Sequence, residues 1–162
     1  MENINDFDGF VISQAQNKHL YTLTKLTQRY FPYANFTFEE VIRRFNDPNI
    51  TYLVAISKGI TICFIDFSIK ENNTVQLLGL AVLEEYRNKG IGKALMNAMF
   101  SKLNLIENER KMKINSIELM VAQDNLPAQK LYFDCGFEKK GLLNRKIFDK
   151  EVAIFVKDYK AV

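Results

Sequence analysis

The residues best able to do chemistry lie in one short stretch, EEYRNKGIGKAL. Gly90 and Gly92 stand where an apolar, strand-like run gives way to a helical pattern. The first N–H groups of a helix have no partner within it, and the helix dipole makes them attractive to anions. A glycine has no Cβ to hold a phosphate away from them, and Arg87, Lys89 and Lys93 add positive charge. The stretch therefore predicts a phosphate or pyrophosphate site.

Two familiar phosphate-binding patterns do not fit these glycines. A nucleotide P-loop needs four residues between its first glycine and a Gly-Lys-Ser/Thr group, and the sequence has no such spacing. The dinucleotide pattern Gly-x-Gly-x-x-Gly needs a third glycine where this chain has Leu95. It also needs a parallel βαβ unit at the start of the fold. The alternative that stays open is a tight turn with solvated charges.

A second motif, AQDNLPAQKLYFDCGF, follows a strand-like run and begins another helix. Asp124 or Asn125 can cap this helix, with Pro127 in its first turn. Gly136 suits the end of the helix, because a glycine readily takes the left-handed conformation found there. One face of the helix carries Ala128, Leu131, Tyr132 and Cys135.

Together, the two motifs resemble the signatures of the GCN5-related N-acetyltransferase (GNAT) superfamily. The run LAV at 80–82 stands where that family has its pantetheine-binding strand. The resemblance covers the chain from about residue 50 to its end, and the element order agrees back to the N-terminus. The family pattern Arg/Gln-x-x-Gly-x-Gly/Ala is matched by Arg87, Gly90 and Gly92. The pattern Asn-x-x-Ala-x-x-Leu-Tyr-x-x-x-Gly-Phe is matched by Asn125, Ala128, Leu131, Tyr132, Gly136 and Phe137.

The resemblance implies that the co-substrate is acetyl-CoA and that no metal takes part. In the family, the pyrophosphate lies on the glycine turn, and the pantetheine arm lies beside the strand that ends in LAV. The backbone groups of Leu80 and Val82 would pair with the pantetheine amides, as an added strand would. The expected cofactor-binding residues are Leu80, Ala81, Val82, Arg87, Asn88, Lys89, Gly90, Ile91, Gly92, Lys93, Asn125, Ala128 and Tyr132.

The implied reaction is direct attack of a primary amine, on a small molecule or on a peptide or protein N-terminus, on the acetyl carbonyl. The backbone N–H of Val82 or a neighbour would polarise the carbonyl oxygen. Tyr132 would protonate or hydrogen-bond the departing thiolate, and Asn125 would hydrogen-bond the cofactor or the acceptor region. A core aromatic whose hydroxyl reaches the edge is the alternative for Tyr132.

The proton acceptor for the amine is missing from its usual place. Many relatives carry a carboxylate just before LAV, where this chain has Leu78 and Gly79. Asp66, Glu118 and Asp124 are substitutes, although each could equally be an ordinary surface or capping acid. A lysine-like amine of pKa about 10.4 is neutral in only about one molecule in 2,500 at pH 7, whereas an α-amino group of pKa about 8 needs less help.

Two other functions compete with N-acetyl transfer. A CoA-binding sensor without turnover would explain the missing carboxylate. Acetylation of aminoacyl-tRNA is known for some relatives, but a net charge of +3 without a dense basic face argues against it. In the family, the segment between the first two helices helps shape the acceptor site. Here it holds aromatic side chains and acids that could hold a cationic amine, or that could serve only core packing and helix capping: Tyr30, Phe31, Tyr33, Phe36, Phe38, Glu39 and Glu40.

The elements around the motifs predict an α/β (α+β) fold with one mixed sheet. The sheet should be mostly antiparallel, with six to seven strands and four flanking helices. Thr37 and Glu40 form a capping box that begins the second helix. A charged connection, either a solvated loop or a helix end, is expected at 107–113. Strands are predicted at 10–14, 50–57, 60–69, 74–83, 114–122 and 151–157, and helices at 17–31, from 37 to Pro48, at 91–106 and from 125 to 135.

Length and composition fit one soluble domain spanning residues 1–162. The acidic, polar start MENINDFDGF does not look like a secretory signal, and no apolar run is long enough for a membrane span. Cys63 and Cys135 are expected to be buried reduced thiols, with a disulfide as the less favoured alternative; with these features, reduced thiols suggest a cytoplasmic protein. His19 is expected to be a surface or satisfied helix residue. A homodimer is expected by analogy with relatives, and a nucleic-acid partner is not expected.

Overall fold

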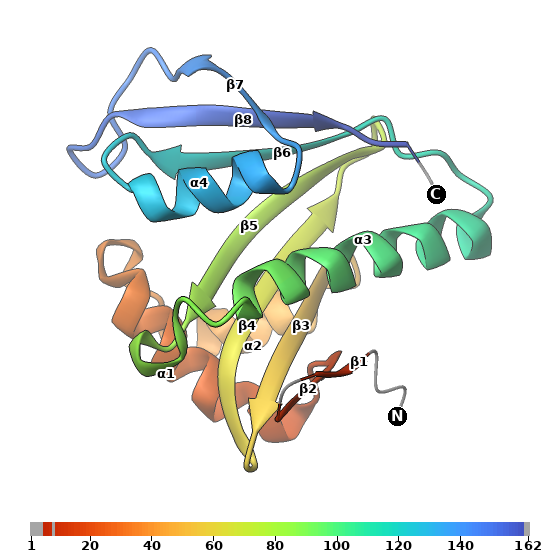
Figure 1. Ribbon diagram of the computed structural model, residues 1–162, viewed down its shortest axis with the longest axis vertical. Helices are drawn as coiled ribbons and strands as arrows, with labels where there is room; N and C mark the ends of the chain where they lie inside the picture. The colour runs from red at the N-terminus through yellow and green to blue at the C-terminus, as the bar shows by residue number, and fades with distance from the viewer. Residues whose placement is uncertain (1–4, 8, 161–162) are drawn as a thin grey trace.

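A computed structural model describes residues 5–7 and 9–160, which build one eight-stranded sheet. Its strand order is β1-β2-β3-β4-β5-β6-β8-β7, and every neighbouring pair is antiparallel except β5 and β6 (Figure 1). The strands are β1 Asn5–Phe7, β2 Phe10–Gln14, β3 Ile50–Ser57, β4 Ile60–Ile69, β5 Thr74–Val82, β6 Ser116–Ala122, β7 Glu138–Leu142 and β8 Val152–Asp158.

Four α-helices flank the sheet, with α1 and α2 on one face and α3 and α4 on the other (Figure 1). The prediction of a mostly antiparallel mixed sheet with four helices is confirmed. Short 3-10 turns occur at Asn17–His19, Pro32–Ala34 and Glu84–Tyr86. The α-helices are α1 Leu20–Tyr30, α2 Phe38–Phe45, α3 Ile91–Arg110 and α4 Leu126–Asp134.

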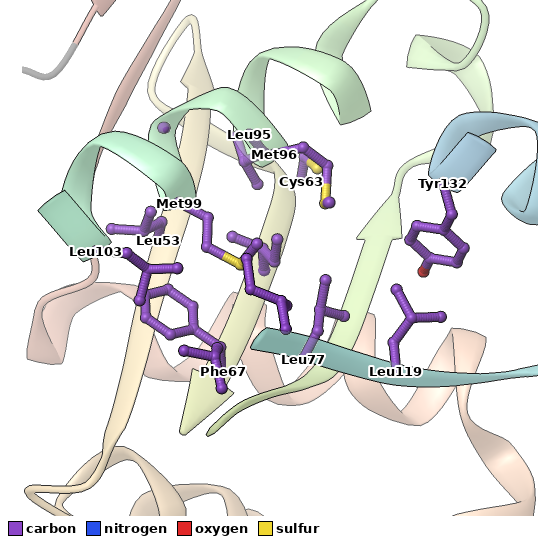
Figure 2. Packing of buried hydrophobic residues seen from close by; sticks show 14 of the residues in the cluster. Leu53, Cys63, Phe67, Leu77, Leu95, Met96, Met99, Leu103, Leu119 and Tyr132 are labelled. Carbon is purple, nitrogen blue, oxygen red and sulfur yellow. The ribbon is translucent and has the colours of Figure 1, made fainter. Parts of the chain in front are cut away.

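Each face of the sheet has its own apolar core, because alternate residues of a strand point to opposite faces. Under α1 and α2, Tyr52, Val54 and Phe64 pack against Leu23 and Leu26. On the other face, α3 contributes the buried side chains shown in Figure 2. These side chains, Leu95, Met96, Met99 and Leu103, pack with Leu53, Cys63, Phe67 and Leu77.

Helix α3 extends beyond the predicted 91–106, so the charged run at 107–113 contains the end of a helix, one of its two predicted forms. The charged run joins the helix because the buried Glu107 carboxylate accepts a hydrogen bond from the N–H of Ile114 at 2.6 Å. The helix ends at Lys111, whose φ is +50°. Consequently β6 begins at Ser116 rather than at residue 114.

The other boundaries lie close to the predicted ones. Strands β2, β3 and β4 match the predicted ranges residue for residue, and β5 ends one residue early. The capping box at the start of α2 is confirmed: the Thr37 Oγ1 accepts from the N–H of Glu40, and the Glu40 carboxylate accepts from the N–H of Thr37. Strand β7 was not predicted, because all five of its residues are exposed and it lacks the apolar alternation of a half-buried strand.

Candidate active site

A gap between β5 and β6 is the central feature of the sheet. The two strands pair only at the start of β5, as far as Gln76 and Glu118. They then diverge, so that the rest of β5 has a neighbour on the β4 side alone (Figure 1). An unpaired strand edge presents N–H and C=O groups that an extended ligand can bind as an added strand.

The groups on this edge belong to the residues expected to bind pantetheine. The N–H of Leu83 donates to the carbonyl of Ile62 on β4 at 2.8 Å. Because neighbouring backbone groups alternate in direction along a strand, Ala81 faces β4 in the same way. Leu80 and Val82 therefore point their backbone groups into the gap. The exposed Arg87 confirms this direction for one of them, since its Nε donates to the Val82 carbonyl at 3.1 Å.

The glycine turn stands at the end of this edge and begins α3. Gly90 is the N-cap residue with a φ of +78°, and no side chain caps the helix among the described residues. The first helical hydrogen bond is made by the N–H of Ala94, which leaves the N–H groups of Ile91, Gly92 and Lys93 without helical partners. A Cβ added at Gly90 would meet nothing within 4 Å. The turn is therefore an open cradle of backbone donors that suits a pyrophosphate.

Gly92 sets how closely the three elements of the site can approach. A Cβ at this residue would lie 3.3 Å from Leu131 on α4 and 3.8 Å from Val82 on β5. The glycine thus lets the first turn of α3 pack between the edge of β5 and α4. The structure brings together the expected cofactor-binding residues of all three segments.

Arg87 and its neighbours tie the turn to α1. The Arg87 guanidinium lies 4.9 Å from the centre of the Tyr30 ring, and the Tyr30 hydroxyl accepts from the N–H of Glu84 at 3.0 Å. Arg29 and Glu84 form an ion pair at 3.7 Å. Lys89 lies over the ring of Tyr86 at 5.4 Å. Asn88 takes a left-handed φ of +59° within the turn.

Helix α4 closes the other side of the gap. The Asn125 side chain caps it, with Oδ1 accepting from the N–H of Ala128 at 3.3 Å. The Gln129 amide donates to the carbonyls of Ala122 and Gln123, which fixes α4 to the end of β6. Gly136, with a φ of +86°, follows the helix as predicted. Asp124 and Asn125 were the two predicted caps of this helix, and Asn125 is the residue that caps it.

Tyr132 points from α4 toward Leu119 on β6, beside the gap (Figure 2). Its side chain is 6% exposed and packs against the rings of Phe137 and Phe155. Its hydroxyl has no hydrogen-bond partner among the described residues, although it is not sealed from solvent. Burial, with a smaller effect of Cys135, raises the pKa of this hydroxyl. Tyr132 therefore stays protonated at neutral pH.

The three acids considered as proton acceptors lie in different surroundings. Glu118 forms an ion pair with Lys70 at 3.7 Å, and Asp124 forms one with Lys150 at 3.1 Å; the side chains of both acids are substantially exposed. Asp66 is instead 2% exposed. Burial raises the pKa of Asp66 to about 6, against the opposing effect of a nearby arginine. Asp66 is thus the one of the three in a strongly altered environment.

The residues that hold Asp66 were not predicted from the sequence. Arg44, in the last turn of α2, donates to Asp66 Oδ2 at 2.7 Å. Its Nε donates to the Tyr52 hydroxyl at 3.3 Å, and Tyr52 is the register partner of Asp66 on β3. These contacts join residues that are 8 to 22 positions apart in the chain, so they depend on the register of β3 with β4 and on the packing of α2 against these strands.

The aromatic segment after α1 divides between packing and the site. Phe31 contacts Phe64 at a ring distance of 6.3 Å. Tyr33 contacts Phe148, in the loop between β7 and β8, at 4.8 Å. Phe36 lies under the Arg44 guanidinium, and Phe38 is exposed. Glu40 is engaged in the capping box.

The remaining candidates have structural roles. Cys63 and Cys135 are free thiols, and burial raises the pKa of each, so neither is an activated nucleophile. His19 is buried, and its Nδ1 accepts from the N–H of Gln16. Within residues 5–7 and 9–160, no cluster of three or more histidine, cysteine or acidic side chains could hold a metal. None of the helices described combines the length and the apolar character needed to cross a membrane.

Known proteins resemble this chain in sequence. The model of the Acetyltransferase (GNAT) family matches residues 20–137. The L-amino acid N-acetyltransferase AaaT of Escherichia coli (strain K12) is 31% identical over 97 residues, which cover 58% of this chain. The match spans 57% of the length of that curated relative.

Solved structures share the fold over nearly the whole chain. The ribosomal-protein-S18-alanine N-acetyltransferase of Escherichia coli superposes with a TM-score of 0.76 at 18% identity, covering 92% of this chain and 93% of the other. NAA60 of Arabidopsis thaliana, in complex with a bisubstrate analogue, superposes with a TM-score of 0.76 at 19% identity, covering 94% and 99%. At these identities the likeness concerns the fold.

Proposed function

We propose that the chain, which belongs to the acetyltransferase (GNAT) family, is an N-acetyltransferase that transfers the acetyl group of acetyl-CoA directly to a primary α-amine. The acceptor would be a small molecule, such as an amino acid, or the N-terminus of a peptide or protein. The observation that carries this proposal is the gap beside β5, where the pairing with β6 ends and the glycine turn begins α3.

The chain's own groups suit each part of acetyl-CoA, which supplies the activated acetyl group when bound. The free N–H groups at the start of α3 would bind the pyrophosphate. Leu80 and Val82 would pair their backbone groups with the pantetheine arm. Arg87 would have to give up the Val82 carbonyl when that carbonyl takes a pantetheine amide. Its guanidinium would then be free for the phosphates.

The transfer step needs charge stabilisation at two atoms. A backbone N–H of Val82 or a neighbour on the open edge would donate to the carbonyl oxygen as negative charge develops there. Tyr132 would donate its proton to the sulfur as the carbon–sulfur bond breaks. The raised pKa of Tyr132 supports this role because the proton is present, and no described residue forms a hydrogen bond with the hydroxyl.

The names of the compared proteins favour an α-amine as the acceptor. The curated relative is named for L-amino acids, and one of the solved structures is named for an alanine of a ribosomal protein. An α-amine has a pKa of about 8, so a useful fraction of it is neutral at pH 7. A lysine side chain would demand a far stronger proton acceptor.

The test is a panel of amines incubated with acetyl-CoA and the purified protein. The panel contains the common L-amino acids, short peptides with free N-termini, the same peptides with blocked N-termini but free lysines, and spermidine. Mass spectrometry of the products and the release of free CoA thiol are followed together. We expect acetylated α-amines to form in proportion to the thiol released. If no amine gains an acetyl group, the proposed function is wrong.

A sensor that binds acetyl-CoA without turnover is the second candidate. Leu78 and Gly79 favour it, since neither can accept a proton from an amine. Tight binding of acetyl-CoA with no product in the same panel would support it. A cytoplasmic location and a homodimer stay predictions.

A further inference from the structure

Asp66 and Gly79 face each other across β4 and β5. They are register partners, and the ladder shifts immediately after them, where Asp66 and Phe67 pair with Gly79 and Leu77 and leave Leu78 as a bulge. Bulges redirect side chains next to active sites. The pair lies just beyond Gln76, where β5 separates from β6. The carboxylate therefore lies beside the start of the gap.

Gly79 leaves room for the carboxylate of its partner. A Cβ added at Gly79 would lie 2.8 Å from Asp66 Oδ1, a distance that real Cβ atoms do not tolerate. The same point is 3.6 Å from a ring carbon of Phe31 and 3.6 Å from one of Phe64. One carboxylate oxygen and two aromatic rings thus surround the face of Gly79. Such surroundings suit an ammonium group, which a carboxylate and ring faces both attract.

The two oxygens of Asp66 have different surroundings. Oδ2 accepts the hydrogen bond of Arg44, whereas Oδ1 is the oxygen that lies against Gly79. Arg44 and Tyr52 are the titratable groups that act on Asp66 among the described residues, from α2 and β3. On β5 and in the segment after α1, the neighbours are Gly79 and Phe31, which carry no charge. A purely structural ion pair would account for Oδ2 but not for a glycine opposite Oδ1.

An open groove lies next to this place, lined by residues of α2, β3, β4 and β5. It has a volume of about 790 Å³ and is lined by Arg44 and Leu78, the neighbours of Asp66 and Gly79, together with residues from the ends of β3 and β4. Acidic and basic side chains both line it, including Asp47, Glu71 and Lys70. A small charged acceptor could therefore enter on this side, while acetyl-CoA occupies the gap on the other.

We propose that Asp66 binds the ammonium group of the acceptor through Oδ1 and accepts its proton, taking the place of a carboxylate on β5. This inference rests on the proposed N-acetyl transfer. The ammonium gives one proton to the carboxylate, which becomes a carboxylic acid. The neutral nitrogen forms its bond to the acetyl carbon, and the carbon–sulfur bond breaks with its electron pair on sulfur. Sulfur takes the Tyr132 proton, the nitrogen's second proton restores Tyr132 through solvent, and Asp66 releases its own proton to solvent.

The central variant is Asp66→Asn, with Glu118→Gln as a control that neutralises a carboxylate on the neighbouring strand. With the best acceptor of the panel, we expect kcat/KM to fall by about a hundredfold for Asp66→Asn and by less than about twofold for the control. Affinity for acetyl-CoA, measured by calorimetry, should stay within about twofold of wild type, because the change lies on the acceptor side.

The pH profile separates a proton acceptor from a structural ion pair. In the wild type, kcat/KM should rise with pH through a step near the titration of Asp66 at about 6. Arg44→Met removes the cation that favours the carboxylate, so this step should move to higher pH. In Asp66→Asn the step should vanish, and the loss should shrink for acceptors of lower amine pKa. A loss that is equal at every pH and for every acceptor would mean that Asp66 is structural, and the inference would be overturned.

Two measurements guard against a variant that folds poorly. Gly79→Ala keeps both charges but places a methyl group on Oδ1, so we expect a fall in kcat/KM of about tenfold or more at a retained acetyl-CoA affinity. In the wild type without acetyl-CoA, 13C NMR of labelled aspartate should show the Asp66 titration move to lower pH when the acceptor is added. An unmoved titration overturns the inference. Absence of any transfer by the wild type overturns the proposed function itself, whereas equal transfer by wild type and Asp66→Asn overturns only the role of Asp66.

Discussion

Gln76 and Glu118 are the last residues at which β5 and β6 pair, and the sheet opens beyond them. On one side of this opening, the turn at Gly90 and the first N–H groups of α3 form an anion site. On the other, α4 supplies the Tyr132 hydroxyl. Deeper in the sheet, Asp66 lies opposite Gly79. The separation of two strands thus creates the space in which all three groups can act.

The glycine turn can be tested with a pair of substitutions that carry the same backbone strain. Gly90 and Gly59 have φ values of +78° and +76°, and a Cβ at either would meet nothing within 4 Å. Alanine at each should cost about 1 kcal/mol of stability. Only Gly90→Ala adds a methyl group to the cradle, so we expect acetyl-CoA affinity to fall about tenfold in that variant alone. Equal affinities of the two variants would show that the pyrophosphate binds elsewhere.

Tyr132→Phe removes the hydroxyl alone and keeps the ring packed against Phe137 and Phe155. Because the hydroxyl has no hydrogen-bond partner among the residues described, stability should change by less than about 0.5 kcal/mol. We expect kcat to fall about tenfold to a hundredfold, at the low end of acid–base effects because a thiol is a good leaving group. The rate of CoA thiol release measures kcat, and thermal unfolding measures the change in stability. An unchanged kcat would assign Tyr132 to packing only.

Asn125 has a capping role and an expected role in the site, and two variants separate them. Asn125→Ala loses the hydrogen bond to the N–H of Ala128 and should cost about 1 kcal/mol. Asn125→Asp keeps a capping oxygen and should retain wild-type stability. If the amide also contacts cofactor or acceptor, transfer should fall in both variants. Full activity in a stable Asn125→Asp would leave the residue with capping alone.

Asp66 should leave a signature in the pH dependence of stability. Its pKa is raised from 3.8 to about 6, so the folded state holds this proton more tightly than the unfolded chain. The stability that this provides is complete below about pH 4 and is lost as the pH rises through about 6. Relative to Asp66→Asn, the wild type should lose about 2 to 3 kcal/mol over this range. Urea unfolding at several pH values measures it, and a difference that stays flat with pH would contradict the burial of Asp66.

The sequence predicted the elements whose local signals were strong. The β-branched runs of β3 and β4 with the Lys58-Gly59 turn between them, and the Thr37 capping box, are decided by neighbours in the chain. Strand β7 was not predicted because its pairing with β8, and not its own residue pattern, makes it a strand. The extension of α3 depends on Glu107 reaching the backbone of Ile114, beyond the helix itself.

The candidate site likewise has one part that local sequence motifs predict and one part that they do not. The glycine turn and the Asn125–Tyr132 helix are short motifs whose residues lie close together in the chain. The types and spacing of these residues were therefore enough to predict both motifs. The surroundings of Asp66 were not, because Arg44, Tyr52 and Gly79 reach it from α2, β3 and β5. Register errors of a single residue would turn Asp66 to the other face of the sheet. Only the assembled strands distinguish it from the exposed Glu118 and Asp124.

Calorimetric titration with acetyl-CoA tests the central claim most directly, with Arg87→Ala and Lys113→Ala beside the wild type. Both variants remove one exposed positive charge, but Lys113 follows the far end of α3 from the glycine turn. We predict that the wild type and Lys113→Ala bind acetyl-CoA alike and that Arg87→Ala binds about tenfold more weakly. Absence of binding by the wild type, or an equal loss in both variants, would contradict the placement of acetyl-CoA between the glycine turn and the open edge of β5.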